Sequence, residues 1–289
     1  MPELPEVETI ARGLASRVTG DVIESVWLGS KPEVLKSSAS EIANTVESKR
    51  IVGVRRVGKH IVFDLENGAR ASSPVKRKSS QKSARASVPS PDKAQWIVHL
   101  GMTGRMLVCN PDQAIEKHTH AVAKLVSGRE LRFVDPRRFG RLSVAHGFEA
   151  AGAEPLEVKL DRFVELFHER KTPIKSALLN QKLLRGVGNI YADESLFRAG
   201  IRPRRRAASL TRNELSRLYS AIQEVLKEAI ELGGSSVSDY VDADGEEGFF
   251  QLQHRVYGRE GEPCLVCKTP IKRVVIAGRS SHYCPKCQK

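Results

Sequence analysis

The sequence contains no apolar run long enough to cross a membrane, because no stretch approaches the roughly 18 uncharged apolar residues that a membrane helix needs. Its first residues, MPELPEVE, are acidic and proline-containing, unlike the basic and apolar regions of a secretory signal peptide. Hydrophobic residues make up 40% of the 289, which is enough for a sizeable core and excludes wholesale disorder. We therefore expect a globular cytoplasmic protein of two domains with a small appendage and no membrane partner.

Acidic residues are scarce relative to basic ones: 34 Asp and Glu stand against 47 Lys and Arg, a formal net charge of +13. Residues 69–93 hold seven basic residues against one acid, and residues 254–289 hold eight against two, so that each segment carries +6. Localised positive charge is typical of proteins that bind a polyanion, most often nucleic acid. A membrane surface is the competing partner, but neither segment has the period of an amphipathic helix.

Cysteine is also rare, and four of the five cysteines lie near the C-terminus as Cys264-x2-Cys267 and Cys284-x2-Cys287. Each CxxC pair lets two thiolates converge on one tetrahedral ion, and the residues between the pairs are long enough for a hairpin. Disulfides are disfavoured in a chain without an export signal. The spacing therefore predicts one structural zinc ion in a C-terminal zinc ribbon.

The hydrophobic pattern predicts an α+β protein of several domains. Residues 3–18 have the apolar spacing of an amphipathic helix. Thr211-x-x-Glu214 is a capping box that predicts the start of a helix ending at Gly233-Gly234. Short β-like runs separated by turn signals occupy 22–28, 51–57, 60–65, 95–100, 105–108, 121–126 and 131–134. We expect an N-terminal β-sandwich or barrel behind one helix (residues 1–150), a helical domain (151–253) and the zinc ribbon (254–289).

Residues 69–93 interrupt the β pattern with seven serines, three prolines and seven basic residues. Such a composition cannot bury a core, so we expect a disordered basic loop inserted between two strands. Two roles remain open for it: a solubilising surface insertion, or additional non-specific contact with phosphates.

Five segments make the chain resemble the formamidopyrimidine-DNA glycosylase family: MPELPEVET at the start, HLGMTGRM at 99–106, DPRRFGRL at 135–142, GVGNIYADESLFRAGI at 186–201, and YGREGEPC with CPKC at the end. The resemblance covers essentially the whole chain except the insertion. It implies a bacterial, nucleoid-associated monomer that flips out and excises oxidised purines from double-stranded DNA. It further implies AP lyase activity by β,δ-elimination and a helix–two-turns–helix motif in the helical domain.

The resemblance assigns the chemistry to Pro2, Glu3, Lys59 and Arg279. Once Met1 is removed, Pro2 is a secondary amine whose pKa of about 8 leaves more of it unprotonated than a lysine, and its attack on C1′ of the sugar gives an iminium. Glu3 is the acid/base residue. Lys59 contacts phosphate and assists β-elimination, with a solvated strand-edge lysine as the alternative, and Arg279 at the ribbon tip grips phosphate and assists δ-elimination. The role of Glu6 stays open.

Flipping a base leaves a hole in the duplex, and Met102, Arg137 and Phe139 match the family residues that fill it. Core packing is the alternative for Met102 and Phe139, but turn signals beside both place them on loop tips. Asn189 is expected to cap a helix whose N–H groups face a phosphate. Further contacts with the DNA backbone are assigned to His99, His118 and Arg170, with Lys171 as an alternative to Arg170. Residues 234–248 resemble the loop that closes over the flipped lesion.

Two other functions remain as alternatives. An endonuclease VIII-like enzyme shares the fold and the nucleophile but prefers oxidised pyrimidines. A non-catalytic zinc-ribbon protein would bind DNA on the same scaffold. The segment PELPEVE and the trio of Met102, Arg137 and Phe139 favour the purine enzyme over the first alternative.

Overall fold

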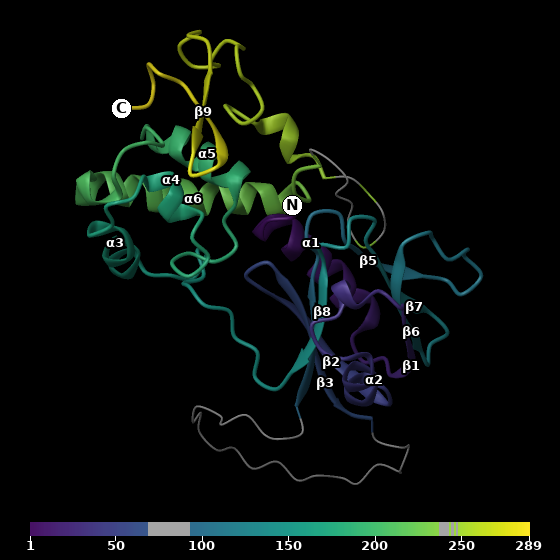
Figure 1. Ribbon diagram of the computed structural model, residues 1–289. Helices are drawn as coiled ribbons and strands as arrows, with labels where there is room; N and C mark the ends of the chain where they lie inside the picture. Colours follow the sequence, from purple (N-terminus) through teal and green to yellow (C-terminus); the bar gives the residue numbers. More distant parts are fainter. Residues whose placement is uncertain (69–92, 237–242, 244–245, 247) are drawn as a thin grey trace. The chain divides into compact units, whose positions relative to one another are not determined.

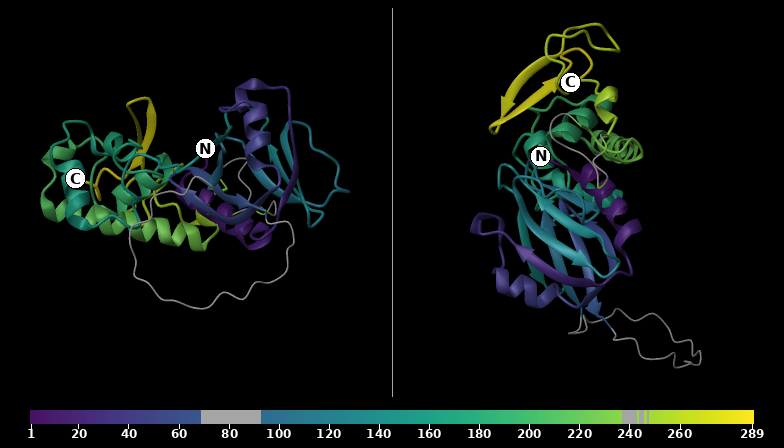
Figure 2. Two further views of the ribbon diagram at one scale, coloured as in Figure 1. Left: turned by 90° about the horizontal axis from the view of Figure 1, so that it is seen from below. Right: turned by 90° about the vertical axis from the view of Figure 1, so that its right-hand side faces the viewer.

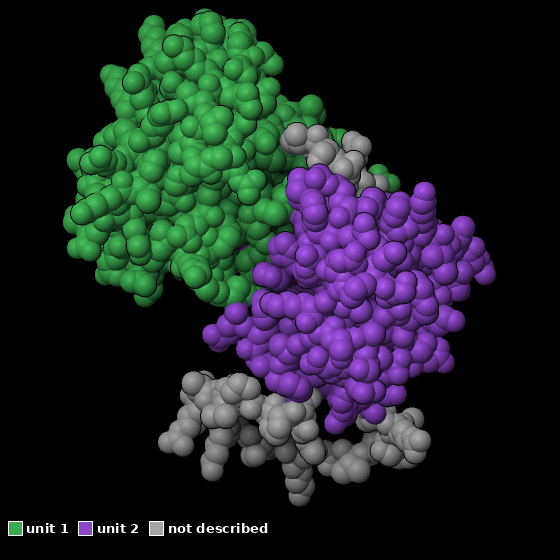
Figure 3. Space-filling model, viewed as in Figure 1, with its two compact units in different colours: residues 1–9, 57–59, 150–289 green, residues 10–56, 60–149 purple. Residues whose placement is uncertain are grey.

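The computed structural model describes residues 1–68, 93–236, 243, 246 and 248–289 (Figure 1). It consists of two compact units (Figure 3). Unit 1 comprises residues 1–9, 57–59 and 150–289, and unit 2 comprises residues 10–56 and 60–149. Residues 69–92 of the predicted disordered insertion and most of the loop at 234–248 lie outside the described residues. None of the helices described is both long and apolar enough to span a bilayer.

The helices and strands follow one another along the chain as α1 (Leu4–Val18), β1 (Ile23–Leu28), η1 (Pro32–Val34), α2 (Ala39–Val46), β2 (Lys49–Val57), β3 (His60–Asn67), β4 (Ala94–His99), β5 (Arg105–Cys109), β6 (Thr119–Leu125), β7 (Glu130–Val134), β8 (Arg141–Ala145), α3 (Leu160–His168), α4 (Ile174–Leu178), α5 (Asn189–Ala199), η2 (Ala207–Ser209), α6 (Arg212–Glu231), η3 (Phe250–Gln253), β9 (Lys272–Ile276) and β10 (Arg279–Tyr283). This order confirms the predicted α+β architecture, with strands in the first half and helices in the second.

The strands of unit 2 form two antiparallel four-stranded sheets in the orders β1-β6-β7-β5 and β2-β3-β4-β8, as expected for a sandwich rather than one closed barrel. Strands β3 and β4 are direct neighbours, with His60 opposite His99 and Leu65 opposite Ala94, so the basic insertion joins two adjacent strands. Large side chains such as Phe63, Trp96 and Phe133 are fully buried and make the core of this unit.

Three elements of unit 2 were not predicted: the 3-10 helix η1, helix α2 and strand β8. Helix α2 is short, but Ser38 caps it by accepting a hydrogen bond from the backbone N–H of Glu41, a Ser-x-x-Glu signal that the sequence does carry. Strand β8 has polar residues among its apolar ones, and its pairing with β4 along Leu142 to Ala145 is what stabilises it. Pairing with a distant strand leaves no local trace in the sequence.

The helices of unit 1 pack around one core that includes Phe163, Tyr191, Leu218 and Phe250. The predicted capping box is confirmed: the Thr211 hydroxyl accepts from the backbone N–H of Glu214, and the Glu214 carboxylate accepts from that of Thr211. Arg205 adds an ion pair with Glu214 and lowers its pKa to about 2. The helix that begins there, α6, runs to Glu231 and supports α5.

The C-terminal hairpin of β9 and β10 belongs to unit 1 and is seen in yellow in both views of Figure 2. Its two-residue turn, Ala277-Gly278, has φ values of +47° and +75°. Positive φ at both central residues is what a type I′ turn requires, and this turn matches the twist of the strands. Arg279 directly follows the turn and pairs with Ile276.

Candidate active site

The carboxyl group of Glu3 lies against the start of helix α5. Its Oε1 accepts a hydrogen bond of 3.1 Å from the backbone N–H of Ile190, whereas Oε2 is buried and has no hydrogen-bond partner among the described residues. A Cβ atom on Gly188 would lie 2.2–2.6 Å from the carboxyl atoms of Glu3. Only glycine at position 188 therefore leaves room for this carboxyl group.

The position of Glu3 explains why the prediction for Asn189 is wrong in one respect. Asn189 is the first residue of α5, and the N-cap is Gly188, which makes no side-chain capping bond. The carboxylate of Glu3 takes the place of a cap, since it accepts from Ile190, the second residue of the helix. The Asn189 side chain instead opposes the rise that burial causes in the pKa of Tyr257, and its Oδ1 is buried without a partner in the described structure.

Glu6, left open by the sequence, holds the start of the chain in place. Its carboxylate accepts from the backbone N–H of Glu3 at 2.8 Å, from the backbone N–H of Ser235 at 2.8 Å, and from the hydroxyl of Tyr191. Glu6 thereby connects the N-terminal segment to α5 and to the residues that follow α6. We assign it a structural role in orienting the backbone beside Pro2, which is itself buried.

The site combines buried groups of opposite charge. Burial raises the pKa of Glu3, and the positive charge of Lys59 partly opposes that rise. Burial lowers the pKa of Lys59, and the positive charge of the Arg279 guanidinium lowers it further. The negative charges of Glu3 and Glu6 act in the opposite direction and raise it. Lys59 is only 8% exposed, which excludes the alternative of a solvated strand-edge lysine. Unit 1 thus brings Pro2, Glu3, Lys59 and Arg279 into one site.

Met102 and Phe139 lie at the tips of two loops in unit 2 and are 39% and 48% exposed, so the core-packing alternative is wrong for both. The guanidinium of Arg137 stacks on the ring of Phe139, with Cζ 4.8 Å from the ring centroid. A Cβ atom on Gly101 would lie 2.4–2.8 Å from the backbone atoms of Phe139 and Gly140. The two loops are therefore in backbone contact.

Asp135 connects the same two loops and was not singled out from the sequence. It is fully buried, and its Oδ1 accepts from the Thr103 hydroxyl at 2.6 Å while its Oδ2 accepts from the backbone N–H of Gly140 at 2.7 Å. An Asp followed by Pro136 is a typical turn signal, which could have pointed to it. The contacts make the loops of Met102 and of Arg137 one rigid unit.

The other predicted contact residues are partly or fully exposed. His99 is half-buried, and its Nδ1 accepts from the backbone N–H of Gly101. His118 is exposed and has a φ of +71°, an uncommon conformation for a residue with a side chain. Arg170 and Lys171 are both exposed, and the guanidinium of Arg170 donates to the carbonyl of Leu166. The roles of these residues stay predictions.

The four predicted zinc ligands come together. The Sγ atoms of Cys264, Cys267, Cys284 and Cys287 all lie within 4.8 Å of one another. The separations of 3.9 Å (Cys264 to Cys287) and 3.4 Å (Cys267 to Cys284) are far beyond a disulfide bond and close to the about 3.8 Å expected between thiolates that share a tetrahedral zinc ion. The donor set therefore fits one structural Zn²⁺, which would stiffen the ribbon and carry out no chemistry.

Comparison with known proteins agrees with this geometry. Family models of the formamidopyrimidine-DNA glycosylase N-terminal domain, its H2TH domain and the zinc finger found in FPG and IleRS match residues 1–142, 151–241 and 261–289. The formamidopyrimidine-DNA glycosylases of Solibacter usitatus and Desulforamulus reducens are 44% and 41% identical, over all of this chain and 100% and 99% of theirs. The chain belongs to the formamidopyrimidine-DNA glycosylase family.

Solved structures of this glycosylase family have the same fold. The MutM (FPG) protein of Thermus thermophilus superposes with a TM-score of 0.81 at 41% identity, covering 99% of this chain and 98% of that one. The Lactococcus lactis Fpg in complex with abasic-site DNA gives a TM-score of 0.84 at 31% identity, with 99% of each chain covered. The chain is therefore a DNA-binding glycosylase of base-excision repair from a bifunctional glycosylase/AP lyase family, with a zinc-finger domain.

Proposed function

We propose that this glycosylase acts as a monomer, in the bacterial cytoplasm at the nucleoid, on oxidised purines in double-stranded DNA such as 8-oxoguanine and formamidopyrimidines. A Lactococcus lactis relative complexed with Fapy-dG DNA supports this lesion class. The work is divided among a catalytic domain (residues 1–150), a helix–two-turns–helix domain (151–253) and the zinc ribbon (254–289). The proposal rests on the carboxyl group of Glu3, which is buried next to Pro2 in the chain and accepts a hydrogen bond from the second residue of α5.

In the proposed mechanism the nitrogen of Pro2 bonds to C1′ of the damaged nucleotide while the bond from C1′ to the base breaks. Glu3, whose pKa is raised by burial, donates its proton to the ring oxygen of the deoxyribose as the ring opens. The resulting iminium accepts electrons when the C2′ proton is removed, and the 3′ phosphate leaves. Lys59 and Arg279 stabilise the departing phosphates of the β and δ steps.

The direct test compares duplexes that carry either an oxidised purine or an oxidised pyrimidine opposite its normal partner. We expect faster excision of 8-oxoguanine than of thymine glycol under single-turnover conditions. The opposite order would favour the endonuclease VIII-like alternative. Binding without either excision or a borohydride-trapped adduct would favour the non-catalytic alternative.

Substitution of Arg137 should remove the preference for a lesion opposite cytosine. In the proposed complex the guanidinium fills the vacated stack and donates to O2 and N3 of the orphan cytosine, whereas adenine has a larger ring and a different donor pattern. A hydrogen-bonded base contact discriminates by about 1–3 kcal/mol, or roughly 5- to 150-fold. Arg137→Ala should lower the excision rate and equalise the rates for lesions opposite cytosine and adenine.

Because Arg137 stacks on Phe139, a substitution of Phe139 serves as a control that should weaken the same preference to a smaller extent. Phe139→Leu keeps an apolar wedge but loses the cation–π contact, which is worth about 0.5–1 kcal/mol at exposed sites. We expect this variant to weaken the preference for cytosine only roughly two- to fivefold. Full preference in Arg137→Ala would show that the residue contacts phosphate alone.

Removal of zinc should abolish tight DNA binding and leave the sheets of unit 2 folded. Metal binding and folding are one process in such ribbons, so loss of the ion releases the hairpin that presents Arg279. Arg279→Ala should reproduce much of the loss with zinc still bound. Binding would be measured by fluorescence anisotropy on abasic-site duplex, with zinc content by mass spectrometry. Unchanged affinity of a Cys264→Ser/Cys267→Ser variant would contradict this role of the ribbon.

A further inference from the structure

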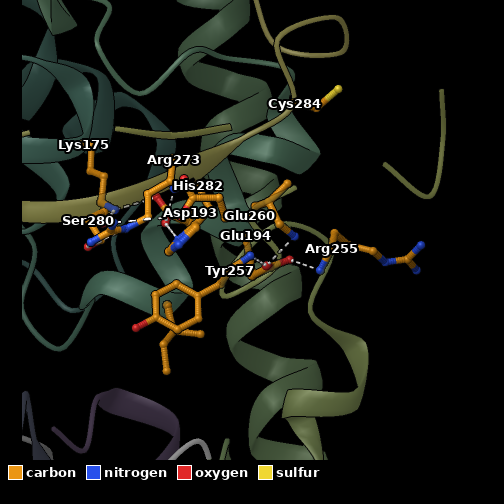
Figure 4. A network of polar contacts seen from close by, with 12 residues as sticks. Lys175, Asp193, Glu194, Arg255, Tyr257, Glu260, Arg273, Ser280, His282 and Cys284 are labelled. Carbon is orange, nitrogen blue, oxygen red and sulfur yellow. Dashed lines mark hydrogen bonds and ion pairs between the residues drawn. The ribbon is translucent and has the colours of Figure 1, made fainter. Parts of the chain in front are cut away.

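Lys175 on α4 is a fully buried lysine that the mechanism above does not use. Its Nζ donates to Oδ1 of Asp193 on α5 at 2.6 Å and to the backbone carbonyl of Ser280 on β10, also at 2.6 Å. Figure 4 shows Lys175 beside Ser280, with Asp193 next to them. A residue of the helical region thus holds a strand that lies 105 positions further along the chain.

Asp193 completes the attachment of the same strand. Its second oxygen accepts from the backbone N–H of His282 at 2.9 Å and lies 3.3 Å from Nδ1 of that residue. Lys175 and Asp193, which are 1% and 0% exposed in their side chains, therefore grip β10 on both sides of the buried Ser281. We call these two residues the β10 anchor.

The β10 anchor holds the end of the strand that the zinc site does not. Cys284 directly follows β10, whereas Arg279 is its first residue, five positions away. At about 3.3 Å per residue in a strand, Arg279 lies about 16 Å from the nearest zinc ligand in sequence. If the zinc site were the only attachment of the hairpin, its tip would lie far from any fixed point. The anchor binds the carbonyl of Ser280, the residue next to Arg279.

One other contact reaches the tip of the hairpin: Nη2 of Arg204 donates to the carbonyl of Val275, which lies opposite Ser280, at 3.3 Å. Two further groups of contacts lie at the base of the ribbon. Glu194 accepts from the backbone N–H groups of Arg255, Val256 and Tyr257, which precede the first zinc ligand. Arg202 donates to the carbonyls of Gln288 and Pro285, which flank the last one. Both hold the base of the ribbon. Lys175 differs from Arg204 in being fully buried, and the carbonyl that it holds belongs to Ser280, the residue next to Arg279.

The chemistry of the anchor suits positioning better than stabilisation. Burial lowers the pKa of Lys175, and the contact with Asp193 and the negative charge of Glu3 oppose this. Buried ion pairs commonly add little stability beyond that of an apolar pair of the same volume, because both charges lose their hydration. Such a pair does, however, fix the direction of each of its hydrogen bonds.

We propose that Lys175, acting through Asp193 and the backbone of β10, is the positioning residue for Arg279 in δ-elimination. The inference rests on the role of Arg279 in the proposed function. With the anchor in place, the guanidinium is held where the last phosphate leaves. Without it, the hairpin tip is displaced while the zinc site, Pro2 and Glu3 are intact.

The experiment is single-turnover cleavage of a preformed abasic-site duplex. Gel electrophoresis separates the 3′-unsaturated aldehyde left by β-elimination from the 3′-phosphate left by β,δ-elimination. In Lys175→Met we expect the δ rate relative to the β rate to fall at least about tenfold, as for loss of one hydrogen bond to a charged group. Zinc content should stay at one ion per chain. Lys227→Met, which removes an exposed lysine from α6, is the matched control and should leave the ratio unchanged.

A second variant separates positioning from folding. Lys175→Met leaves the carboxylate of Asp193 buried and unpaired, so its melting temperature should fall. Lys175→Met/Asp193→Asn removes that charge and should recover melting temperature without recovering the δ-to-β ratio. If Lys175→Met alone does not fold, the double variant carries the test. Equal loss of the β and δ rates, or recovery of the ratio together with the melting temperature, would overturn the proposal and indicate a purely structural pair.

Arg279→Ala distinguishes the failure of this inference from that of the proposed function. If Arg279→Ala leaves the δ-to-β ratio unchanged, the assigned role of Arg279 is wrong, and the positioning role of Lys175 with it. If Arg279→Ala lowers the ratio and the folded, zinc-loaded Lys175 variants do not, only the positioning role is wrong. A double variant of Lys175 and Arg279 should show no further loss beyond Arg279→Ala alone, because both act on one step.

Discussion

Protein in which Pro2 carries a preceding residue should form no borohydride-trapped adduct with abasic-site DNA, and mature protein beginning at Pro2 should form it readily. The reaction needs the lone pair of a free secondary amine, with a pKa of about 8. When Met1 is attached, the nitrogen of Pro2 is part of an amide, and its lone pair is delocalised into the carbonyl group. The expected change is complete loss of the adduct, the largest effect predicted for this enzyme.

The comparison needs two forms of the same chain. A cleavable N-terminal tag that ends directly before Pro2 keeps the amine blocked until the protease is added, and mass spectrometry verifies both forms. Adduct formation is read as a shifted band after borohydride reduction. A tetrahydrofuran-site duplex, which cannot react, measures DNA binding separately. Equal trapping in both forms would show that the nucleophile is another amine, with Lys59 the first to examine.

The features that sequence analysis predicted correctly depend on short-range rules. The zinc site follows from the spacing of two CxxC pairs, and the four thiols do converge. The start of α6 follows from a capping box within four residues, and both of its hydrogen bonds are present. Exposure of Met102 and Phe139 follows from the turn residues around them. In each case all the determinants lie close together in the sequence.

The features that sequence analysis missed depend on partners far apart in the chain. Asn189 looked like a helix cap, but the cap is provided by Glu3, 187 positions away from Ile190. Glu6 binds Ser235 across 229 positions, and Lys175 binds Ser280 across 105. A single glutamate or lysine carries no sign of such a partner. Only the fold, by bringing these segments together, makes their roles visible.

Replacement of Glu3 by glutamine should reduce excision by about 10²–10⁴-fold, the usual contribution of a positioned general acid. The side chain keeps its size, and its remaining carbonyl oxygen can still accept from the N–H of Ile190, so the loss should reflect the missing proton. Glu8→Gln on α1, the helix that begins directly after Glu3, is the matched control for removing one carboxylate, and we expect it to retain most of the activity. Single-turnover excision of 8-oxoguanine measures both.

The pH dependence gives a second test of the same role. Burial raises the pKa of Glu3, so its acid form persists to higher pH than that of an ordinary glutamate. Excision should rise with pH as the amine of Pro2 loses its proton and fall as Glu3 loses its own, giving a bell-shaped profile. In Glu3→Gln the falling limb should disappear, because the amide does not titrate, while the rising limb stays. A falling limb unchanged in Glu3→Gln would belong to another group.

Gly188→Ala tests whether excision depends on the position of the Glu3 carboxyl group, without altering any reacting group. Its added Cβ would approach the carboxyl atoms of Glu3 to within 2.2–2.6 Å, so the carboxyl group must leave its hydrogen bond with Ile190. We expect a loss of excision that approaches that of Glu3→Gln, with zinc content and binding to undamaged DNA retained. If Gly188→Ala excises normally, the acid does not need its place on α5. The proton would then come from a mobile carboxyl group or from water, and the close packing of Gly188 against Glu3 would be structural alone.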